Sequence, residues 1–451
     1  MSEMLIASSA APTVVGLGET GLSCVRHFVE RGIPVSVVDS REDPPGLSAL
    51  KAFAPAVPVE LGALDAEALA SAGRLVVSPG IPLTEPAVAA AMAAGVPVCG
   101  DIDIFCETVS APVVGITGSN GKSTVTALLG QMLVDAGRRV AVGGNLGTPA
   151  LSLLDDAVEL YVLELSSFQL ERAGQLGLAL ATVLNMSPDH MDRHGNMQAY
   201  HTAKHRIFLD CEAVVFNRDD PLSRPLQSYS VPHWSFGLGT PDRNGYGLRE
   251  HQGVPWIFRE FAPLMPAADV AMLGGHNLAN ALAGLALGEL LAIPQDSMLA
   301  TLRTFTGLPH RCQPVGEWQG VRFINDSKAT NPGATLAALE GLGGDTQLVI
   351  ILGGQGKGAD FSDLCRAVAQ SCRAAVLVGE AARQFDASLP PALTRVFAGS
   401  MEEAVAAAAD LAQPGDTVLL SPACASFDMF RGFEDRGARF AESVARLGEA
   451  G

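Results

Sequence analysis

The sequence is poor in charged residues and has no excess of positive charge. Charged side chains make up 17% of its 451 residues, and 48 acidic residues outnumber 30 basic ones, which gives a net charge of −18 at pH 7. A surface that binds nucleic acid or an anionic membrane normally needs a basic face. The charge balance therefore argues against both classes of partner.

Cysteine pairs, targeting signals and membrane-length apolar runs are also lacking. The eight cysteines include no C-x-x-C pair, which is typical of reduced thiols in a cytosol. The opening MSEMLIASSAAP has no basic region followed by an uninterrupted apolar core, so no secretory signal is predicted. The most apolar long run, residues 278–293, contains Asn280 and Glu289 and is too short to span a bilayer. We therefore expect a core helix there and a cytoplasmic protein. The sequence gives no persuasive oligomeric interface, so a monomer is expected.

Apolar residues and glycine are abundant instead. Apolar residues make up 48% of the sequence, and 48 residues are glycine. Such a profile suits several buried parallel sheets joined by tight loops. Short apolar runs alternate with helical stretches along the chain, as in βαβ units. We predict an α/β fold of three domains: a Rossmann-like domain at 1–102, a P-loop ATPase-like domain at 103–307 and a second Rossmann-like domain at 308–451. The strands are expected at TVVGLG, PVSVVDS, RLVVSPG, VPVCG, APVVGITG, RRVAVGGNLG, ELYVLELSS, LATVLNMS, VRFINDS, QLVIILGG, AAVLVGE and DTVLLSP.

The first turn, GLGETG, begins at Gly16 after an apolar strand and opens a helix expected over residues 21–30. Asp39 ends the next strand about 20 residues further on, as in a dinucleotide-binding turn. Taken alone, this pattern predicts a nicotinamide dinucleotide.

The stretch GITGSNGKST is a second candidate phosphate site, although it lacks the first glycine of the pattern G-x-x-x-x-G-K-[ST]. Gly118 and Gly121 still permit backbone angles that turn N–H groups toward one anion, and the following helix adds its positive end. Lys122 would reach the terminal phosphates, and Ser123 or Thr124 would ligate Mg²⁺. The alternative is an ordinary glycine-rich turn.

Two further residues carry chemical signals. Glu164 ends a buried strand, where a parallel sheet exposes ligand-facing residues, and it is either a Mg²⁺ ligand or a carboxylate satisfied by neighbouring backbone. Lys204 has Tyr200, Ile207 and Phe208 as helical neighbours and so faces an apolar stripe. Its amine either extends past the stripe into solvent or is held within it with a lowered pKa, as a neutral nucleophile.

Histidines are concentrated in one segment, with four of the nine between His190 and His205. His201 and His205 are four residues apart, but HTAKH lacks the glutamate of a metalloprotease helix, which disfavours zinc. Asn277 and Asn280 begin an apolar helix, where one of them is either a ligand or simply an N-cap. Further polar residues lie near strand ends, the edge at which α/β sheets bind ligands: His310, Arg311, Asp326, Lys328, Thr330, Lys357 and Ser426.

Together these motifs resemble the Mur ligases, the ATP-dependent amide ligases that build the peptide stem of bacterial peptidoglycan. The similarity covers nearly the whole chain: GLGETGLS, GITGSNGKST, LELSSFQLE, DHMDRHG, GGHNLANALA, GLPHR, INDSKATNP, LGGQGKGADF and LSPACASFDMFRGFEDRG. The last four stretches are similar to the members that add D-glutamate, and no DNPR-type motif of the diaminopimelate- or lysine-adding members is present.

The resemblance implies that ATP phosphorylates the L-alanine carboxylate of UDP-N-acetylmuramoyl-L-alanine and that the amine of D-glutamate attacks the acyl phosphate, releasing ADP and phosphate. It implies ATP binding by Gly118, Asn120, Gly121, Lys122, Ser123, Thr124, Asn277, Asn280, Arg311 and Asp326, with His310 beside them. It implies two Mg²⁺ ions held by Ser123, Glu164, His190 and Lys204, the lysine being carbamylated by CO₂. The catalytic group would be Lys122, Glu164, His190 and Lys204.

For the two other substrates the resemblance implies separate sites. The UDP part would be held by Gly18, Thr20, Asp39, Arg41, Ser78, Pro79, Gly80 and Asn145. D-Glutamate would be held by His190, Lys328, Thr330, Lys357, Ser426 and the backbone at Phe433. Closure of the third domain over the second, with a hinge near residues 305–310, would exclude water from the acyl phosphate. One departure from the family pattern is acidic Glu19 in the first turn, where an apolar residue is expected near the uracil.

Other functions compete with this interpretation. A dehydrogenase would rest on GLGETG and Asp39 alone and would leave GITGSNGKST unexplained. A non-catalytic nucleotide-dependent switch would keep the phosphate loop and tolerate the loss of Lys204. A ligase similar to folylpolyglutamate synthetase would have no reason to bind UDP through its first domain.

Overall fold

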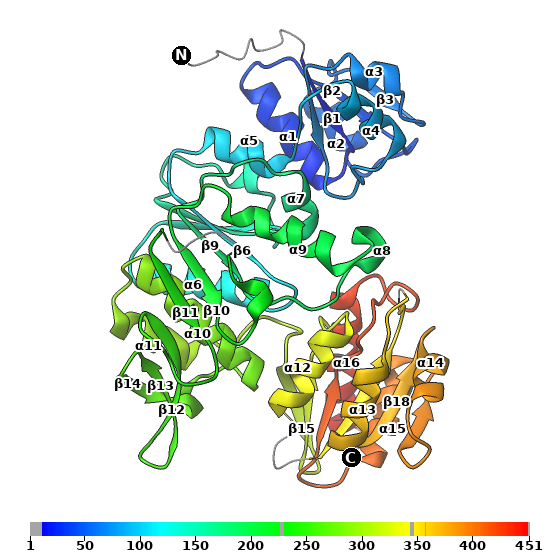
Figure 1. The fold of residues 1–451 in the computed structure, drawn as a ribbon. Coiled ribbons are helices and arrows are strands. Elements are labelled where there is room, and N and C mark those ends of the chain that lie inside the picture. The colour runs from blue at the N-terminus through cyan, green and yellow to red at the C-terminus, as the bar shows by residue number, and fades with distance from the viewer. Residues whose placement is uncertain (1–10, 226–229, 343–346, 357, 450–451) are drawn as a thin grey trace.

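The computed structural model describes residues 11–225, 230–342, 347–356 and 358–449, which form three sheets flanked by helices (Figure 1). The N-terminal sheet lies at one end of the molecule, the C-terminal sheet at the other, and the central sheet between them. Each of the apolar runs expected to be a strand forms one, which confirms the α/β class. Within the described ranges, no helix is both long enough and apolar enough to cross a bilayer.

The N-terminal sheet has five parallel strands in the order β3-β2-β1-β4-β5. Its first helix begins at Glu19, two residues earlier than expected, so Gly21 lies in the first turn. A Cβ on Gly21 would collide with the carbonyl oxygen of Gly16, which explains why glycine is needed there. The elements are β1 (Pro12–Val15), α1 (Glu19–Glu30), β2 (Ser36–Asp39), α2 (Leu47–Phe53), β3 (Val59–Leu61), α3 (Ala66–Ala70), β4 (Arg74–Val77), α4 (Pro86–Ala93) and β5 (Val98–Cys99).

The central sheet has nine strands in the order β14-β13-β12-β11-β10-β9-β6-β8-β7. Strands β6 to β12 run parallel, and β13 and β14 extend the sheet as an antiparallel meander that the sequence analysis did not predict. The strands are β6 (Val113–Thr117), β7 (Val140–Gly144), β8 (Leu160–Glu164), β9 (Leu180–Val183), β10 (Val214–Asn217), β11 (His233–Phe236), β12 (Gly245–His251), β13 (Val254–Arg259) and β14 (Ala262–Pro266). The helices are α5 (Asp101–Thr108), α6 (Lys122–Asp135), α7 (Ser167–Arg172), α8 (Met191–His194), α9 (Met197–His205), α10 (Gly275–Leu290) and α11 (Gln295–Thr304), with the 3₁₀ turns η1 (Ala150–Leu153), η2 (Arg206–Phe208), η3 (Pro221–Ser223) and η4 (Ala267–Asp269).

The C-terminal sheet has six strands in the order β15-β16-β20-β17-β18-β19, all parallel except β15. Strands β17 and β20 are buried along their whole length, as expected for a parallel sheet covered on both faces. The elements are β15 (Gln313–Trp318), β16 (Val321–Asn325), α12 (Pro332–Leu342), β17 (Leu348–Gly353), α13 (Ser362–Ser371), β18 (Cys372–Val378), α14 (Ala382–Ser388), β19 (Thr394–Phe397), α15 (Met401–Leu411), β20 (Thr417–Leu420) and α16 (Phe433–Glu449).

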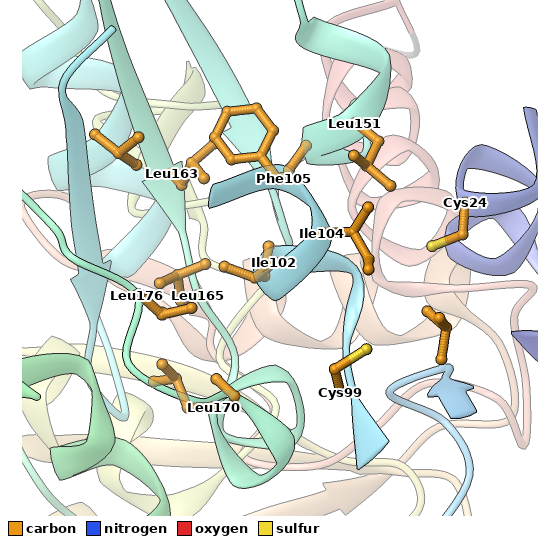
Figure 2. Close-up of a cluster of buried hydrophobic side chains, with 14 of the residues drawn as sticks. Cys24, Cys99, Ile102, Ile104, Phe105, Leu151, Leu163, Leu165, Leu170 and Leu176 are labelled. Atoms are coloured by element: carbon orange, nitrogen blue, oxygen red, sulfur yellow. The ribbon is translucent and has the colours of Figure 1, made fainter. Parts of the chain in front are cut away.

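One apolar cluster runs without a break from the N-terminal sheet into the central sheet. Figure 2 shows Cys24 of α1 and Cys99 of β5 on one side, Ile104 and Phe105 of α5 in the middle, and Leu163 of β8 on the other. All five are at most 5% exposed, so the two sheets are held together by buried apolar surface. The predicted boundary at residue 102 falls inside α5, and the division into domains stays a prediction.

Candidate functional site

One cavity of about 550 Å³ lies where the carboxyl ends of the central strands face the start of the C-terminal part. This is the edge at which parallel α/β sheets bind ligands. The cavity brings together fifteen of the residues predicted from the sequence: Asn120, Gly121, Lys122, Ser123, Thr124, Asn145, Glu164, His190, Lys204, Asn277, Asn280, Arg311, Asp326, Lys328 and Thr330.

The loop after β6 has the backbone of a phosphate cradle. Gly118 and Gly121 adopt φ values of +151° and +81°, which side chains other than glycine rarely allow. A Cβ on Gly121 would also collide with Oδ1 of Asn280, because α10 packs closely against the loop. Helix α6 begins directly after this glycine and directs its positive end into the cavity. The loop therefore has the shape and the polarity to hold an anion despite its missing first glycine.

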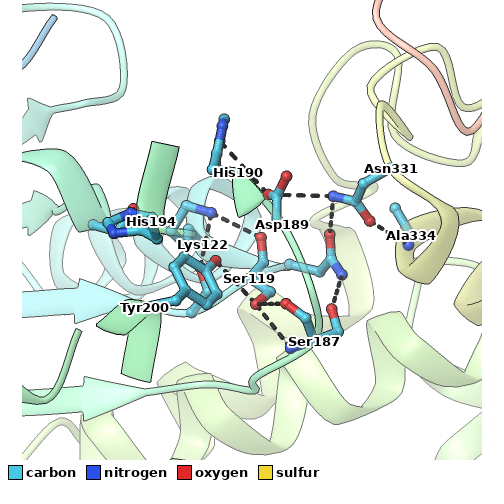
Figure 3. A network of polar contacts seen from close by, with 12 residues as sticks. Ser119, Lys122, Ser187, Asp189, His190, His194, Tyr200, Asn331 and Ala334 are labelled. Carbon is cyan, nitrogen blue, oxygen red and sulfur yellow. Dashed lines mark hydrogen bonds and ion pairs between the residues drawn. The ribbon is translucent and has the colours of Figure 1, made fainter. Parts of the chain in front are cut away.

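Lys122 lies at the head of α6 and folds back over the loop (Figure 3). Its Nζ donates to the carbonyl oxygens of Gly118 and Ser119, each at 2.9 Å. Burial lowers the pKa of Lys122, and the carboxylates of Glu164 and Asp189 act in the opposite direction. A cation already held at the loop by neutral carbonyl groups is well placed to meet a phosphate.

Ser123 and Glu164 meet at the mouth of the loop. Ser123 Oγ donates to Glu164 Oε2 at 2.5 Å, and Asn145 Nδ2 donates to Glu164 Oε1 at 2.6 Å. Arg311 from the C-terminal part donates to Ser123 Oγ at 2.7 Å. Hydroxyl and carboxylate oxygens are hard donors of the kind Mg²⁺ prefers, and both converge on the phosphate loop. Ser123 and Glu164 therefore fit a magnesium ion, and Glu164 is bonded to side chains rather than to neighbouring backbone.

Lys204 is held inside the protein and does not reach solvent. The residue is 1% exposed, and its Nζ donates to Gly118 O at 2.9 Å and to Thr117 Oγ1 at 3.2 Å. The ammonium also lies 4.8 Å from the centre of the Tyr200 ring. Burial, followed by the nearby charge of Lys122, places the pKa of Lys204 well below its ordinary value. Of the two alternatives left by the sequence, the buried amine is confirmed, and such an amine fits carbamylation.

His190 lines the same cavity from a strained position before α8. Its φ is +55°, its Nε2 lies 3.7 Å from Asp189 Oδ2, and its ring meets Phe168 edge-on at 4.8 Å. Two other histidines of this segment, His201 and His205, stack with their ring centres 3.8 Å apart. Across the described chain, no three His, Cys, Asp or Glu side chains cluster as a metal site.

The remaining predicted ATP residues border the loop. Helix α10 begins at Gly275 after its N-cap Gly274, so of the two alternatives left by the sequence the N-cap is wrong for both asparagines. Asn280 Nδ2 donates to Asn277 Oδ1 at 3.1 Å inside the helix. Asp326 accepts from Cys312 N at 3.2 Å and from Ser421 Oγ at 2.8 Å, and burial raises its pKa to about 7.

The predicted D-glutamate residues are divided. Lys328 lines the cavity with Thr330, its Nζ lies 3.8 Å from the centre of the Phe433 ring, and burial lowers its pKa to about 8. The carbonyl oxygen of Phe433 accepts from Ser327 Oγ at 2.8 Å. Neither Ser426 nor Phe433 is among the described residues that line the cavity, and Lys357 lies outside the described residues. His310, which was expected beside the ATP residues, is not among the described residues that line the cavity, and it donates its backbone N–H to Gln313 Oε1 at 3.0 Å.

The predicted UDP residues of the N-terminal part follow the carboxyl ends of β1, β2 and β4, away from the cavity. Asp39 Oδ2 accepts from Leu17 N and from Arg41 Nη2, both at 2.7 Å, and its Oδ1 accepts from Arg41 N and from Arg41 Nε, both at 2.9 Å. Burial would raise the pKa of Asp39, but these hydrogen bonds, with that from Arg41 first, lower it to about 2. Both oxygens are thus bonded to protein groups, unlike the free acidic acceptor of a dinucleotide ribose. The other members are Gly18, Thr20, Ser78, Pro79 and Gly80, with Glu19 exposed beside them.

The structure adds residues that the sequence analysis missed. Asn331 Nδ2 donates to Asn120 Oδ1 and to Asp189 Oδ2, each at 3.4 Å, so the C-terminal part reaches the phosphate loop (Figure 3). Its Oδ1 accepts from Ala334 N at 2.8 Å and caps α12. A signal was present, because an asparagine directly before Pro332 is typical of a helix start.

Three family models together match most of the chain: "Mur ligase MurD-like, N-terminal domain" at residues 10–100, "Mur ligase middle domain" at 116–288 and "Mur ligase, glutamate ligase domain" at 310–424. Proteins named UDP-N-acetylmuramoylalanine--D-glutamate ligase are 55% identical in Pseudomonas aeruginosa, over 98% of this chain and 99% of the relative, and 50% identical in Acinetobacter baylyi, over 98% and 100%. Solved structures with the same fold include UDP-N-acetylmuramate-alanine ligase from Thermotoga maritima, with a TM-score of 0.59 and 19% identity over 98% of this chain and 100% of that one. MurF ligase from the same organism, solved with ADP, also has a TM-score of 0.59, at 16% identity over 98% and 97%.

Proposed function

The chain belongs to the Mur ligase family, and from this premise we propose that it joins D-glutamate to UDP-N-acetylmuramoyl-L-alanine at the expense of ATP. The product would be a peptidoglycan precursor made in the cytoplasm, with ADP and phosphate released. The observation that carries the proposal is the single cavity in which the phosphate loop, the Ser123–Glu164 pair and Lys328 of the C-terminal part meet. In an amide ligase, the site that activates the carboxylate and the site that holds the amine must lie close together.

The chemical problem is charge. A carboxylate is a poor electrophile, and it is repelled by the triphosphate that must phosphorylate it. Lys122 would hold the terminal phosphates, while Asn277, Asn280, Arg311 and Asp326 would hold the rest of ATP. Bound Mg²⁺ would neutralise charge between phosphate and carboxylate, and Ser123 and Glu164 would be ligands of one ion. His190 and a carbamylated Lys204 would hold a second ion, since CO₂ converts the amine into an anion.

The amine of D-glutamate would then attack the acyl phosphate from the C-terminal side. Lys328, with a pKa of about 8, is mostly charged at neutral pH and would hold a carboxylate of the amino acid. Thr330, Lys357, Ser426 and the backbone at Phe433 would complete this site after the C-terminal part closes, with the hinge near residues 305–310. Asn331, which already reaches Asn120 and Asp189, would help to keep water from the acyl phosphate.

We propose that the N-terminal part holds the UDP portion and that the chain divides into domains at 1–102, 103–307 and 308–451. The predicted residues Gly18, Thr20, Asp39, Arg41, Ser78, Pro79 and Gly80 would grip UDP, and Asn145 would contact the same substrate near Glu164. The nicotinamide prediction made from GLGETG alone does not fit the bonded state of Asp39.

The test is ligation with a panel of D- and L-amino acids, with ADP release and the dipeptide-linked product followed together. We expect ADP release to require both UDP-N-acetylmuramoyl-L-alanine and D-glutamate. Comparable release without either substrate, or equal use of another amino acid, would contradict the proposal. A nicotinamide dinucleotide should bind no more tightly than a matched mononucleotide.

A further inference from the structure

Arg172 is an unusually buried cation that connects two parts of the protein. It is the last residue of α7 in the central part, and its side chain is 0% exposed. Its guanidinium lies against the loop after β4 in the N-terminal part. It donates to the carbonyl oxygens of Val77 at 3.1 Å, Ser78 at 2.7 Å, Pro79 at 3.4 Å and Ile81 at 3.1 Å.

The loop held by Arg172 also contacts the first glycine turn. Ser78 Oγ donates to the carbonyl oxygen of Gly16 at 2.8 Å, so the loop and the turn form one unit. A Cβ on Gly16 would approach Ser78 and Ile81 at 3.0 Å or less, which shows how closely the two segments pack. The position of Arg172 is thereby transmitted to the turn proposed to hold the UDP diphosphate.

At its N-terminal end, α7 is connected to Glu164 and His190. The helix begins three residues after Glu164, and Arg172 Nε donates to the carbonyl oxygen of Phe168 at 2.8 Å. The Phe168 ring packs against His190. Arg193 reinforces the link, because its Nη2 donates to Ile81 O at 3.2 Å while its guanidinium lies 5.1 Å from the centre of the Phe168 ring.

Docking of the two parts does not by itself explain a buried arginine. The apolar cluster through α5 already joins them (Figure 2). The only carboxylate paired with Arg172 among the described residues is Glu171, at 3.5 Å, so its charge is compensated chiefly by carbonyl dipoles. Burying such a charge costs more than an apolar side chain of similar size would. What the guanidinium adds is a fixed geometry, since its planar fork orients several carbonyl groups at once.

We propose that Arg172 is a positioning residue that fixes the distance between the UDP-binding loop at residues 78–80 and the activating centre at Glu164 and His190. The inference rests on the proposed function. A substrate that binds at both ends gains affinity from the second contact only if the spacing of the two sites matches its own length. Loosening this spacing weakens the binding of a substrate that contacts both sites and leaves the binding of a ligand that contacts only one site unchanged.

The experiment compares Arg172→Met and Arg172→Lys with the parent protein by calorimetry and steady-state kinetics. The ligands are UDP, UDP-N-acetylmuramoyl-L-alanine and ADP. We expect both variants to bind UDP and ADP within about 2-fold of the parent, and to bind the full UDP substrate about 10-fold more weakly, with a raised KM and a lowered kcat. Arg206→Met is the matched control, because Arg206 Nε donates at 2.8 Å to the neighbouring Ala173 O and stays within the central part.

Equal losses for UDP and for the full substrate, or no loss for either, would overturn the proposal, since Arg172 would then act only on local folding or not at all. Thermal unfolding identifies a variant that does not fold; Arg172→Lys keeps the charge and supplies the test if the methionine variant fails. Failure of the parent protein to ligate D-glutamate, or to bind UDP, would instead count against the proposed function.

Discussion

Lys204 Nζ lies 2.9 Å from the carbonyl oxygen of Gly118, so a buried amine on α9 contacts the underside of the phosphate loop. The other hydrogen-bond partner of the amine is the hydroxyl of Thr117, and neither partner carries a negative charge. Because burial places the pKa of Lys204 well below its ordinary value, a larger fraction of this amine is neutral than for an exposed lysine at the same pH. Only the neutral amine can attack CO₂.

We therefore expect ligation to depend on dissolved CO₂. Exhaustive removal of CO₂ should lower the rate severalfold, and added bicarbonate should restore it, because the carbamate forms and breaks reversibly. Incubation with ¹³CO₂ should produce a carbamate signal in the ¹³C NMR spectrum. The signal should be absent in Lys204→Ala and present in Lys51→Ala, which changes an exposed lysine. A rate that does not respond to CO₂, or full ligation activity of Lys204→Ala, would contradict a role for the carbamate.

Glu164→Gln should weaken the dependence on magnesium at the phosphate loop. The substitution keeps the size of the side chain and the contact with Asn145 but removes the negative charge that faces Ser123. We expect the Mg²⁺ concentration for half-maximal ADP release to rise at least about 10-fold, since an anionic oxygen ligand is lost. Glu159→Gln is the control, because this exposed carboxylate lies just before the same strand, outside the cavity. Parallel Mg²⁺ titrations of the two variants that superimpose would contradict a ligand role for Glu164.

Much of the fold could be predicted from the sequence because its signals are local. Buried parallel strands appear as continuous apolar runs, and the strained glycines at 118 and 121 lie within the motif that they shape. The burial of Lys204 also had a local sign in its apolar helical neighbours. The meander β12–β14 was missed because its strands alternate polar and apolar residues weakly, so that neighbouring strands in the sheet determine them more than their own pattern does.

The site was harder to predict wherever its contacts join distant segments. Arg172 lies more than 90 residues from the loop that it holds, and LERAGQ contains no motif that predicts a partner. Arg311 and Ser123 are separated by 188 residues and meet only because the C-terminal part packs over the phosphate loop. Residue types reveal candidate ligands in such cases, but the tertiary fold decides which of them meet.

Asn331→Asp should slow ligation more than it destabilises the protein. The aspartate keeps an oxygen that can cap α12, but it replaces the amide donor by an anion opposite Asp189. We expect kcat/KM to fall about 10-fold, which corresponds to about 1.4 kcal/mol, with little change in Tm. Ser400→Ala is the converse control, since Ser400 caps α15 by accepting from Glu403 N at 3.2 Å, away from the cavity. It should lower stability by about 1 kcal/mol without slowing ligation. If Asn331→Asp lowered activity and Tm together, the role of Asn331 would be limited to capping α12.

The contribution of Asp101 to the stability of the folded protein should decrease as the pH rises. It is the first residue of α5 and is buried; Gln169 Nε2 donates to its Oδ2 at 3.1 Å, and its Oδ1 has no hydrogen-bond partner among the described residues. Burial raises the pKa of Asp101 to about 6, although Gln169 and Arg172 oppose the shift. In the unfolded chain an aspartate has a pKa of about 3.9.

Because the folded state holds this proton more tightly, the stabilisation is complete below about pH 4 and is lost as the pH rises through about 6. The difference between the two pKa values corresponds to about 3 kcal/mol. Asp101→Asn has no such proton to lose, so its Tm relative to the parent should increase between about pH 4 and about pH 6 and then level off. Asp156→Asn, which changes an exposed aspartate, should show no such trend. A Tm difference that stays constant or reverses across this range would mean that Asp101 is ionised in the folded protein. The positive N-terminal end of α5 and the charge of Arg172 would then outweigh the effect of burial on its pKa.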